Sequence, residues 1–169
     1  ELSKPASTTR MGRRCVPDLQ RIDDRTIVNL KVAINDSEAV ADRLDLAETI
    51  VLSIGTDAWL LVSDNRSAND IVGDCEQFLN DLLYNAVDYS SGLVIFRISG
   101  SSVRELLAMG SGLDVRPAAF GVGSCVRTRL AQIAVVVVAT GEDEFELYLD
   151  RSYERHLNNW IQDSNSLIE

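Results

Sequence analysis

The sequence predicts an α+β protein made of two small lobes, each an antiparallel sheet covered by helices. Two observations predict this class. Short apolar runs rich in β-branched residues alternate with segments whose apolar residues recur every three or four positions, and turn residues separate them. The order in the first half, strand–helix–strand–strand–helix–strand, is the ferredoxin-like arrangement, and the second half follows a variation of it. We expect an N-terminal tail or arm over residues 1–25, a first lobe over 26–90 and a second lobe over 91–169.

The first lobe begins with an alternating segment over 26–34, which indicates a half-buried strand. Asp36 and Ser37 can cap a short helix after it, which carries Val40, Leu44 and Leu46. Ser67 begins the clearest helix, with apolar residues at three- and four-residue spacing through Leu83. The remaining strands are expected over 49–54 and 59–63, joined by a hairpin turn at 55–57, and over 86–89.

The second lobe has equally clear boundaries between its elements. Ser102 and Glu105 predict a capping box for a helix that ends at Gly110 and Gly112. The last helix is expected to begin near Arg151, and its apolar stripe consists of Tyr153, Leu157, Trp160 and Ile161. The strands of this lobe are expected over 93–98, 125–130, 133–139 and 145–149.

Residue types that carry catalysis are scarce. The chain has one histidine, His156, and two lysines, Lys4 and Lys31, so a multi-histidine metal site is excluded. Neither lysine follows a glycine, which excludes a Walker A loop, and no GxSxG elbow is present. The run at 121–124 lacks the third glycine and the following helix of a dinucleotide loop. We expect His156 to be a rim or core residue, and no catalytic, cofactor-binding or metal-binding residues in this chain.

Charge and apolar pattern exclude two further classes. There are 26 acidic and 16 basic residues, a net charge of −10, which makes nucleic-acid binding unfavourable. The longest strongly apolar run, 133–139, is too short to span a membrane. An acidic cluster of Asp143, Glu144 and Glu146 lacks EF-hand spacing, so we expect a solvated turn there.

The cysteines indicate the compartment. Cys15, Cys75 and Cys125 are odd in number and far apart, which is typical of free thiols in a reducing environment. The first residues contain no apolar signal segment. We therefore expect a cytoplasmic protein.

Five residues are candidates for contact with a partner. Arg127 and Arg129 lie two apart on one strand, and Arg151 begins the last helix, so the three can hold a carboxylate ligand or the acidic side chains of a partner. The alternative is a set of surface ion pairs with the abundant Asp and Glu. Trp59 and Trp160 are anchors either of the core or of an interface. The basic residues before position 26 form an arm for an acidic partner or for the body of the protein, or a solvated terminus.

Several short motifs occur in a fixed order over about residues 48–163. The first is LSIGTDAWLLV at 52–62. Its Thr56 and Ala58 are departures from the family pattern described below, which has Pro and Glu at these two positions. The others are FRISG at 96–100, RELLAMG at 104–110, LDVRPAAF at 113–120, GSCVRTRL at 123–130 and FELYLDRSY at 145–153. This ordered set resembles the gamma (small) subunit of the heterotetrameric sarcosine oxidases. We identify no motif of that family in residues 1–47.

The resemblance implies two aminomethyltransferase-like lobes and an accessory, non-catalytic subunit without a cofactor of its own. It implies direct docking on an alpha subunit, with beta and delta subunits in the same assembly. FAD, covalent FMN, NAD and tetrahydrofolate would be held by those partner subunits. The assembly would demethylate sarcosine oxidatively, yielding glycine, hydrogen peroxide, and formaldehyde or methylene-tetrahydrofolate, a reaction of one-carbon metabolism.

Two alternatives stay open. One is a stand-alone folate-binding module that holds the glutamate carboxylates of folate with Arg127, Arg129 or Arg151. The other is a gamma-like subunit of a related dehydrogenase that acts on another N-methyl amino acid.

Overall fold

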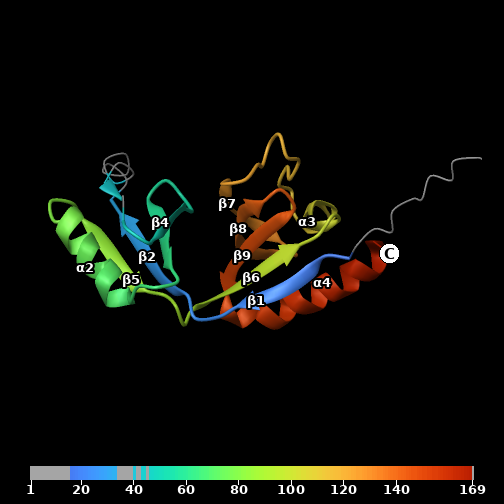
Figure 1. The fold of residues 1–169 in the computed structure, drawn as a ribbon, viewed down its shortest axis with the longest axis horizontal. Helices are drawn as coiled ribbons and strands as arrows, with labels where there is room; N and C mark the ends of the chain where they lie inside the picture. Colours follow the sequence, from blue (N-terminus) through green and yellow to red (C-terminus); the bar gives the residue numbers. More distant parts are fainter. Residues whose placement is uncertain (1–15, 34–39, 41–42, 45, 169) are drawn as a thin grey trace, which may run out of the picture.

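The computed structural model describes residues 16–33, 40, 43–44 and 46–168, and it contains two antiparallel sheets (Figure 1). Each sheet carries helices on its outer face, and the helix-free faces of the two sheets are turned toward each other. The layers therefore run helix, sheet, sheet, helix, which confirms the predicted α+β class.

The first lobe consists of the four-stranded sheet and the helix that covers it. Its sheet has the order β3-β4-β2-β5, with all neighbours antiparallel. In chain order this is second, third, first and fourth, the ferredoxin-like order that the sequence predicts. The predicted short helix before β3 falls mostly outside the described residues, although Val40 and Arg43 are helical. The elements are β2 (Thr26–Val32), β3 (Ile50–Ser53), β4 (Ala58–Ser63), α2 (Ala68–Phe78) and β5 (Tyr84–Asp88).

The second lobe is the five-stranded sheet with two helices on its outer face. Its order is β1-β6-β9-β8-β7. Strands β7, β8 and β9 form a meander, and β6 extends the sheet by pairing with β9. Leu106 and Leu107 of α3, and Leu157 and Ile161 of α4, enter the same core cluster as the strands. The elements are β1 (Asp18–Ile22), β6 (Leu93–Ser99), α3 (Val103–Gly110), β7 (Cys125–Leu130), β8 (Ile133–Gly141), β9 (Glu144–Asp150), the 3-10 turn η2 (Arg151–Tyr153) and α4 (Glu154–Ile168).

Strand β1 corrects the prediction that residues 1–25 are a tail. Residues 18–22 instead form an edge strand of the second lobe, paired antiparallel with β6 from Asp18↔Ser99 to Ile22↔Ile95. Leu19 packs against the core beneath the helices, and Ile22 packs against the cluster between the sheets. One apolar side chain on each face therefore holds the strand in register.

Three apolar clusters hold the molecule together. One lies between the first sheet and α2, a second lies between the second sheet and helices α3 and α4, and a third joins the two sheets. The third, which we call the inter-sheet cluster, consists of Ile27, Leu52, Leu60, Val62, Ile95, Val136, Val138 and Tyr148. Because no helical residue belongs to this cluster, the two lobes meet through their sheets.

Two helix boundaries differ from the prediction. Ser102 makes no side-chain capping bond, because its backbone (φ −101°, ψ 7°) lacks the extended conformation that an N-cap requires. Ser67 does form a capping box, with Asp70. Helix α2 ends at Phe78, so Leu83 lies beyond it and is 77% exposed.

Candidate functional site

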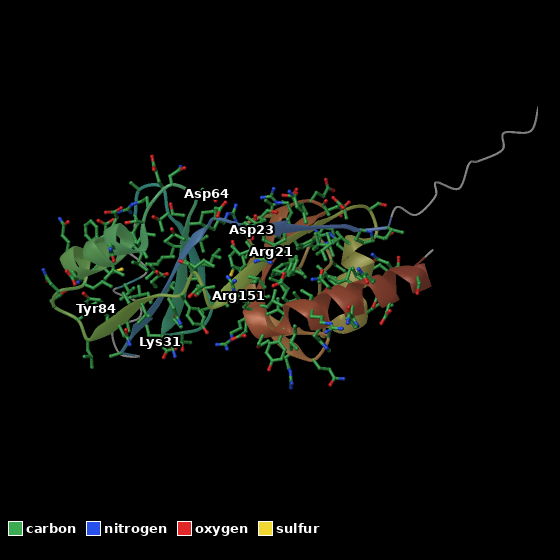
Figure 2. The ribbon with its side chains drawn as sticks, turned by 90° about the horizontal axis from the view of Figure 1, so that it is seen from below. Arg21, Asp23, Lys31, Asp64, Tyr84 and Arg151 are labelled. Atoms are coloured by element: carbon green, nitrogen blue, oxygen red, sulfur yellow. The ribbon has the colours of Figure 1, made fainter. Side chains whose placement is uncertain are left out.

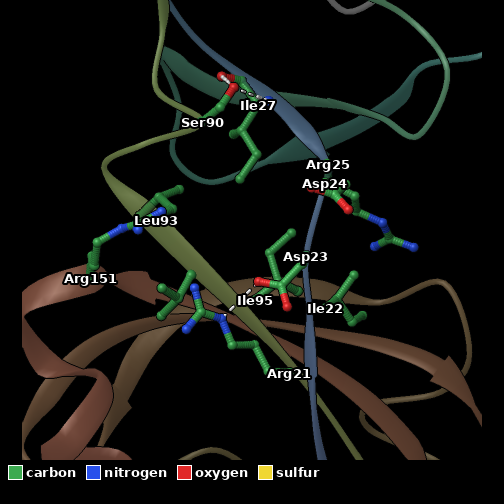
Figure 3. Close-up of a pocket in the computed structure, with 11 residues that line it drawn as sticks. Arg21, Ile22, Asp23, Asp24, Arg25, Ile27, Ser90, Leu93, Ile95 and Arg151 are labelled. Carbon is green, nitrogen blue, oxygen red and sulfur yellow. Dashed lines mark hydrogen bonds and ion pairs between the residues drawn. The ribbon is translucent and has the colours of Figure 1, made fainter.

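Two short segments connect the lobes, 23–25 before β2 and 89–92 after β5. The second segment is tied to the start of β2 at Ile27, whose amide donates to the Ser90 hydroxyl (2.9 Å) and whose carbonyl accepts from the Tyr89 amide (2.7 Å). The segments border a small hollow of about 50 Å³, lined also by Arg21 and Arg151 (Figure 3). Figure 3 shows Arg21 beside Asp23, with which it forms an ion pair of 2.9 Å.

A buried polar cluster links the lobes at the end of the inter-sheet cluster. The carboxylate of Glu146, on β9, is paired with Arg25 (2.7 Å) and Arg97 (2.9 Å) and accepts the Tyr148 hydroxyl (2.7 Å). Arg25 also pairs with Asp64, which follows the last strand residue of the first lobe's β4, at 2.6 Å. The guanidinium of Arg25 therefore bridges carboxylates of both lobes. We call these residues the Glu146 cluster.

Glu146 corrects the prediction of a solvated acidic turn, since it is only 3% exposed. Burial by itself would raise the pKa of its carboxyl, but hydrogen bonds from Tyr148, Arg97 and Arg25 outweigh burial and lower that pKa. Burial and the neighbouring carboxylate raise the pKa of Tyr148, so its hydroxyl keeps the proton that it donates. The cluster is charged and structural in character, and the Nε of Arg97 is its one buried side-chain polar atom without a hydrogen-bond partner among the described residues.

Beyond the inter-sheet cluster the two sheets part and enclose a cleft of about 360 Å³. The position of the cleft can be followed along alternate residues of β9 and β2, which point toward the other sheet. On β9, Glu146 lies in the polar cluster, Tyr148 in the inter-sheet cluster, and Asp150 in the cleft. On β2, Ile27 lies in the inter-sheet cluster, while Asn29 and Lys31 line the cleft.

The lining of the cleft is mostly apolar. Ile54, Leu60, Leu93 and Val136 are among the apolar lining residues. Two exposed tyrosines, Tyr89 and Tyr153, also line it. This combination of apolar walls and a few polar groups is typical of a binding site.

Three charged residues line the cleft. Lys31 comes from β2 and Arg127 from β7, so the two cations approach from opposite sheets. Both are exposed, and within the described part of the chain neither side chain has a hydrogen-bond or ion-pair partner. One oxygen of the Asp150 carboxylate, Oδ1, accepts from the amide (2.8 Å) and hydroxyl (2.6 Å) of Ser152. These neutral donors leave the carboxylate ionised, so the cleft has two cations against one anion and its net charge is positive.

Asn29 contributes an unsatisfied polar atom. Its side-chain carbonyl oxygen is buried and has no hydrogen-bond partner among the described residues, although the residue lines the cleft. A buried acceptor without a donor costs about 1–3 kcal/mol. Because the oxygen is buried, a donor in the cleft cannot reach it without a movement of this side chain.

The three predicted arginines do not line one site. Arg127 lies in the cleft. Arg129 is exposed two residues further along β7, where its guanidinium donates to the carbonyl of Gln132 (3.0 Å). Arg151 borders the separate hollow between the connecting segments, where the two lobes adjoin (Figure 2). Of the three, the structure brings only Arg127 together with other candidate groups.

The two tryptophans have different positions. Trp59 is 5% exposed and belongs to the core beneath α2, so the hypothesis that it anchors an interface is wrong for the folded chain. Trp160, on α4, is half-buried against the core of the second lobe. His156 is exposed on the same helix, and its Nε2 lies 2.9 Å from the carbonyl oxygen of Ala131.

Lys31, Asn29 and the two tyrosines of the cleft are functional candidates that the sequence did not identify. The signal was present, because Asn29 and Lys31 alternate with buried apolar residues along β2. That pattern normally indicates a solvated face. Within the described ranges no group of three or more His, Cys, Asp or Glu residues can hold a metal, and no helix is long and apolar enough to cross a membrane.

Two solved structures share this arrangement of sheets and helices. The heterotetrameric sarcosine oxidase from Corynebacterium sp. U-96, in complex with pyrrole 2-carboxylate, matches with a TM-score of 0.77 at 22% identity, covering 90% of this chain and 85% of that one. The glycine cleavage system aminomethyltransferase T from Bartonella henselae matches with a TM-score of 0.64 at 15% identity, covering 90% of this chain and 47% of the enzyme. The chain therefore has a fold of the aminomethyltransferase type.

The family follows from the sequence match. Residues 28–167 match the sarcosine oxidase, gamma subunit family. The gamma subunit of sarcosine oxidase from Corynebacterium sp. strain U-96 is 26% identical over 98% of this chain and 78% of its own length. That from strain P-1 is 27% identical over 70% of this chain and 57% of its own length. The chain belongs to the sarcosine oxidase gamma subunit family.

Proposed function

We propose that this chain is the accessory, non-catalytic gamma subunit of a heterotetrameric, sarcosine-oxidase-like flavoenzyme. The observation that carries the proposal is the family match, which spans nearly all of both lobes. The polar groups of the cleft support an accessory role, because Lys31, Arg127, Asp150 and Asn29 do not pair a nucleophile with a general base.

In this proposal the chain docks directly on an alpha subunit, with beta and delta subunits in the same cytoplasmic assembly. FAD, FMN, NAD and tetrahydrofolate belong to those partner subunits. The assembly oxidises sarcosine to glycine with production of hydrogen peroxide, and releases the methyl carbon as formaldehyde or methylene-tetrahydrofolate. The absence of a disulfide between the described cysteines, Cys75 and Cys125, fits a reducing compartment.

Co-expression tests the proposal. The chain carries an affinity tag and is produced together with the alpha, beta and delta subunits encoded in the same genome. We expect a stoichiometric complex that has flavin absorbance and forms hydrogen peroxide from sarcosine. If the tagged chain elutes alone while the other three subunits form an active flavoprotein without it, the proposal is wrong. Substrate profiling of the same complex distinguishes sarcosine from other N-methyl amino acids.

A stand-alone folate-binding module is a second candidate, and one observation favours it. Arg127 presents an unpaired guanidinium in a cleft large enough for part of a small ligand. Isothermal titration of the isolated chain with tetrahydrofolate tests this function directly. Absence of binding heat at millimolar ligand excludes it.

A further inference from the structure

We infer that the cleft between the two sheets is the docking site for the alpha subunit, and that the docked segment carries a carboxylate side chain flanked by apolar ones. This inference rests on the proposed function, which supplies the partner, and adds the surface and its chemistry. Two independent features of the cleft support it: its unpaired cations and the exposed apolar side chains around it.

The first argument is charge. The chain has a net charge of −10, and most described arginines have a carboxylate partner. Lys31 and Arg127 have none within the described ranges, although acidic side chains outnumber basic ones. Two unpaired cations that line one cleft from different sheets favour an acidic group in it. The paired arginines are Arg21, Arg25, Arg43, Arg66, Arg97, Arg104 and Arg116.

The second argument is the exposed apolar surface at the mouth. Tyr89 and Tyr153 line the cleft and are 37% and 45% exposed. Val87 is 49% exposed and lies directly opposite Asn29 in the pairing of β5 with β2, so it shares the face that forms the cleft wall. Large apolar side chains around a cavity are typical of a protein interface. A small ligand inside the cleft would leave Val87 uncovered, which favours a polypeptide occupant.

The two arguments together specify the occupant. The docked segment would place its acidic side chain against Lys31 and Arg127, while apolar side chains beside it cover Tyr89, Tyr153 and Val87.

Charge reversal in the co-expressed complex tests the inference. The variants are Lys31→Glu and Arg127→Glu, and the matched control is Arg116→Glu. The Arg116 side chain is 82% exposed, pairs with Asp114 on the same loop, and does not line the cleft. Each substitution changes the net charge by the same amount. Circular dichroism and thermal unfolding of each isolated chain establish that it is folded before its affinity for the alpha subunit is measured.

We expect Lys31→Glu and Arg127→Glu each to weaken binding of the alpha subunit about tenfold or more, and Arg116→Glu to change it by less than about twofold. Lys31→Gln and Arg127→Gln, which remove charge without reversing it, should show smaller losses in the same direction. Their surface positions make them a second test if a reversal variant fails to fold.

Two results would overturn the inference. In the first, the wild-type chain binds the alpha subunit and both cleft variants bind as tightly as the control, so docking uses another surface while the proposed function stands. In the second, the variants lose binding of tetrahydrofolate by the isolated chain but assemble normally, so the occupant is a small anion. Failure of the wild-type chain to bind the alpha subunit contradicts the proposed function itself.

Discussion

The guanidinium of Arg25 lies 2.7 Å from the carboxylate of Glu146, across 121 residues of sequence. Arg25 belongs to the segment that connects the lobes, and Glu146 lies on a strand of the five-stranded sheet. Asp64 of the first lobe holds the other side of the same guanidinium. Because Glu146 is buried and Arg25 nearly so, this pair is less screened by solvent than a surface ion pair.

Removing the charge of Glu146 should destabilise the chain strongly. In Glu146→Gln, two arginines lose their buried carboxylate partner, and we expect a loss of about 3 kcal/mol in the free energy of unfolding. Urea denaturation at pH 7 measures it. The control is Glu144→Gln, two residues earlier on the same strand. The Glu144 side chain is 41% exposed, and its ion pair with Arg97 is long, at 3.7 Å. We therefore expect Glu144→Gln to lower the free energy of unfolding by less than about 1 kcal/mol. Equal losses would contradict the structural role of the cluster.

The same carboxylate predicts a dependence of stability on pH. The pKa of Glu146 is lower in the folded chain than in the unfolded chain, where it is about 4.3. Its stabilising contribution is therefore complete above that unfolded value and is lost as the pH falls through the folded pKa. We expect the difference in unfolding free energy between wild type and Glu146→Gln to be constant from pH 7 to about 5 and to shrink below about 4. A difference that grows on acidification would contradict the lowered pKa.

Gly110 should not tolerate a side chain. A Cβ atom at this position, the last residue of α3, would lie 2.5 Å from the ring of Trp160 and 2.9 Å from a methyl of Leu130. We expect Gly110→Ala to cost about 1–3 kcal/mol and to shift the fluorescence of Trp160. Gly112→Ala is the matched control, because nothing lies within 4 Å of its Cβ position. If both variants unfold at the same urea concentration as the wild type, the packing of α4 on α3 differs from this description.

The two described cysteines should be unreactive. Burial raises the pKa of Cys75 and of Cys125 to about 11. Since the thiolate is the reacting species, we expect iodoacetamide at pH 7.5 to modify both at least about a hundredfold more slowly than a free cysteine. Peptide mass spectrometry distinguishes the sites, and labelling in denaturant is the control. Rapid labelling of Cys125 in the folded chain would indicate that β7 separates from Ser53, whose carbonyl accepts the Cys125 thiol.

The sequence predicted the elements whose apolar pattern is strong. The strands β2 to β9 and the helices α2 to α4 have regular apolar spacing, so local preference and burial agree. Strand β1 was missed because it has only two apolar residues, Leu19 and Ile22, one on each face. Its stability comes from pairing with β6, more than seventy positions later, which no local pattern reports.

The candidate site was predictable only in part. Arg127 was identified from its spacing to Arg129, and the structure places it in the cleft. Lys31 and Glu146 were not, because each lies on the polar face of an alternating strand, which normally faces water. Here that face meets the other sheet, so the polar residues line a cleft or become buried. The relation between two sheets distant in sequence decides the environment of these side chains.

The place of β1 has a consequence for the order in which the chain folds. Since β1 and β6 are neighbours in one sheet, the whole first lobe is an insertion between two adjacent strands of the second. During synthesis the inserted lobe can fold from its own residues, whereas β1 stays unpaired until β6 has been synthesised. Ile22 and Ile95 lie opposite each other where the insertion leaves and re-enters the sheet. The second lobe is therefore a domain into which the first lobe is inserted. A short loop joining β1 directly to β6 would delete the first lobe and leave the strand order of the second unchanged.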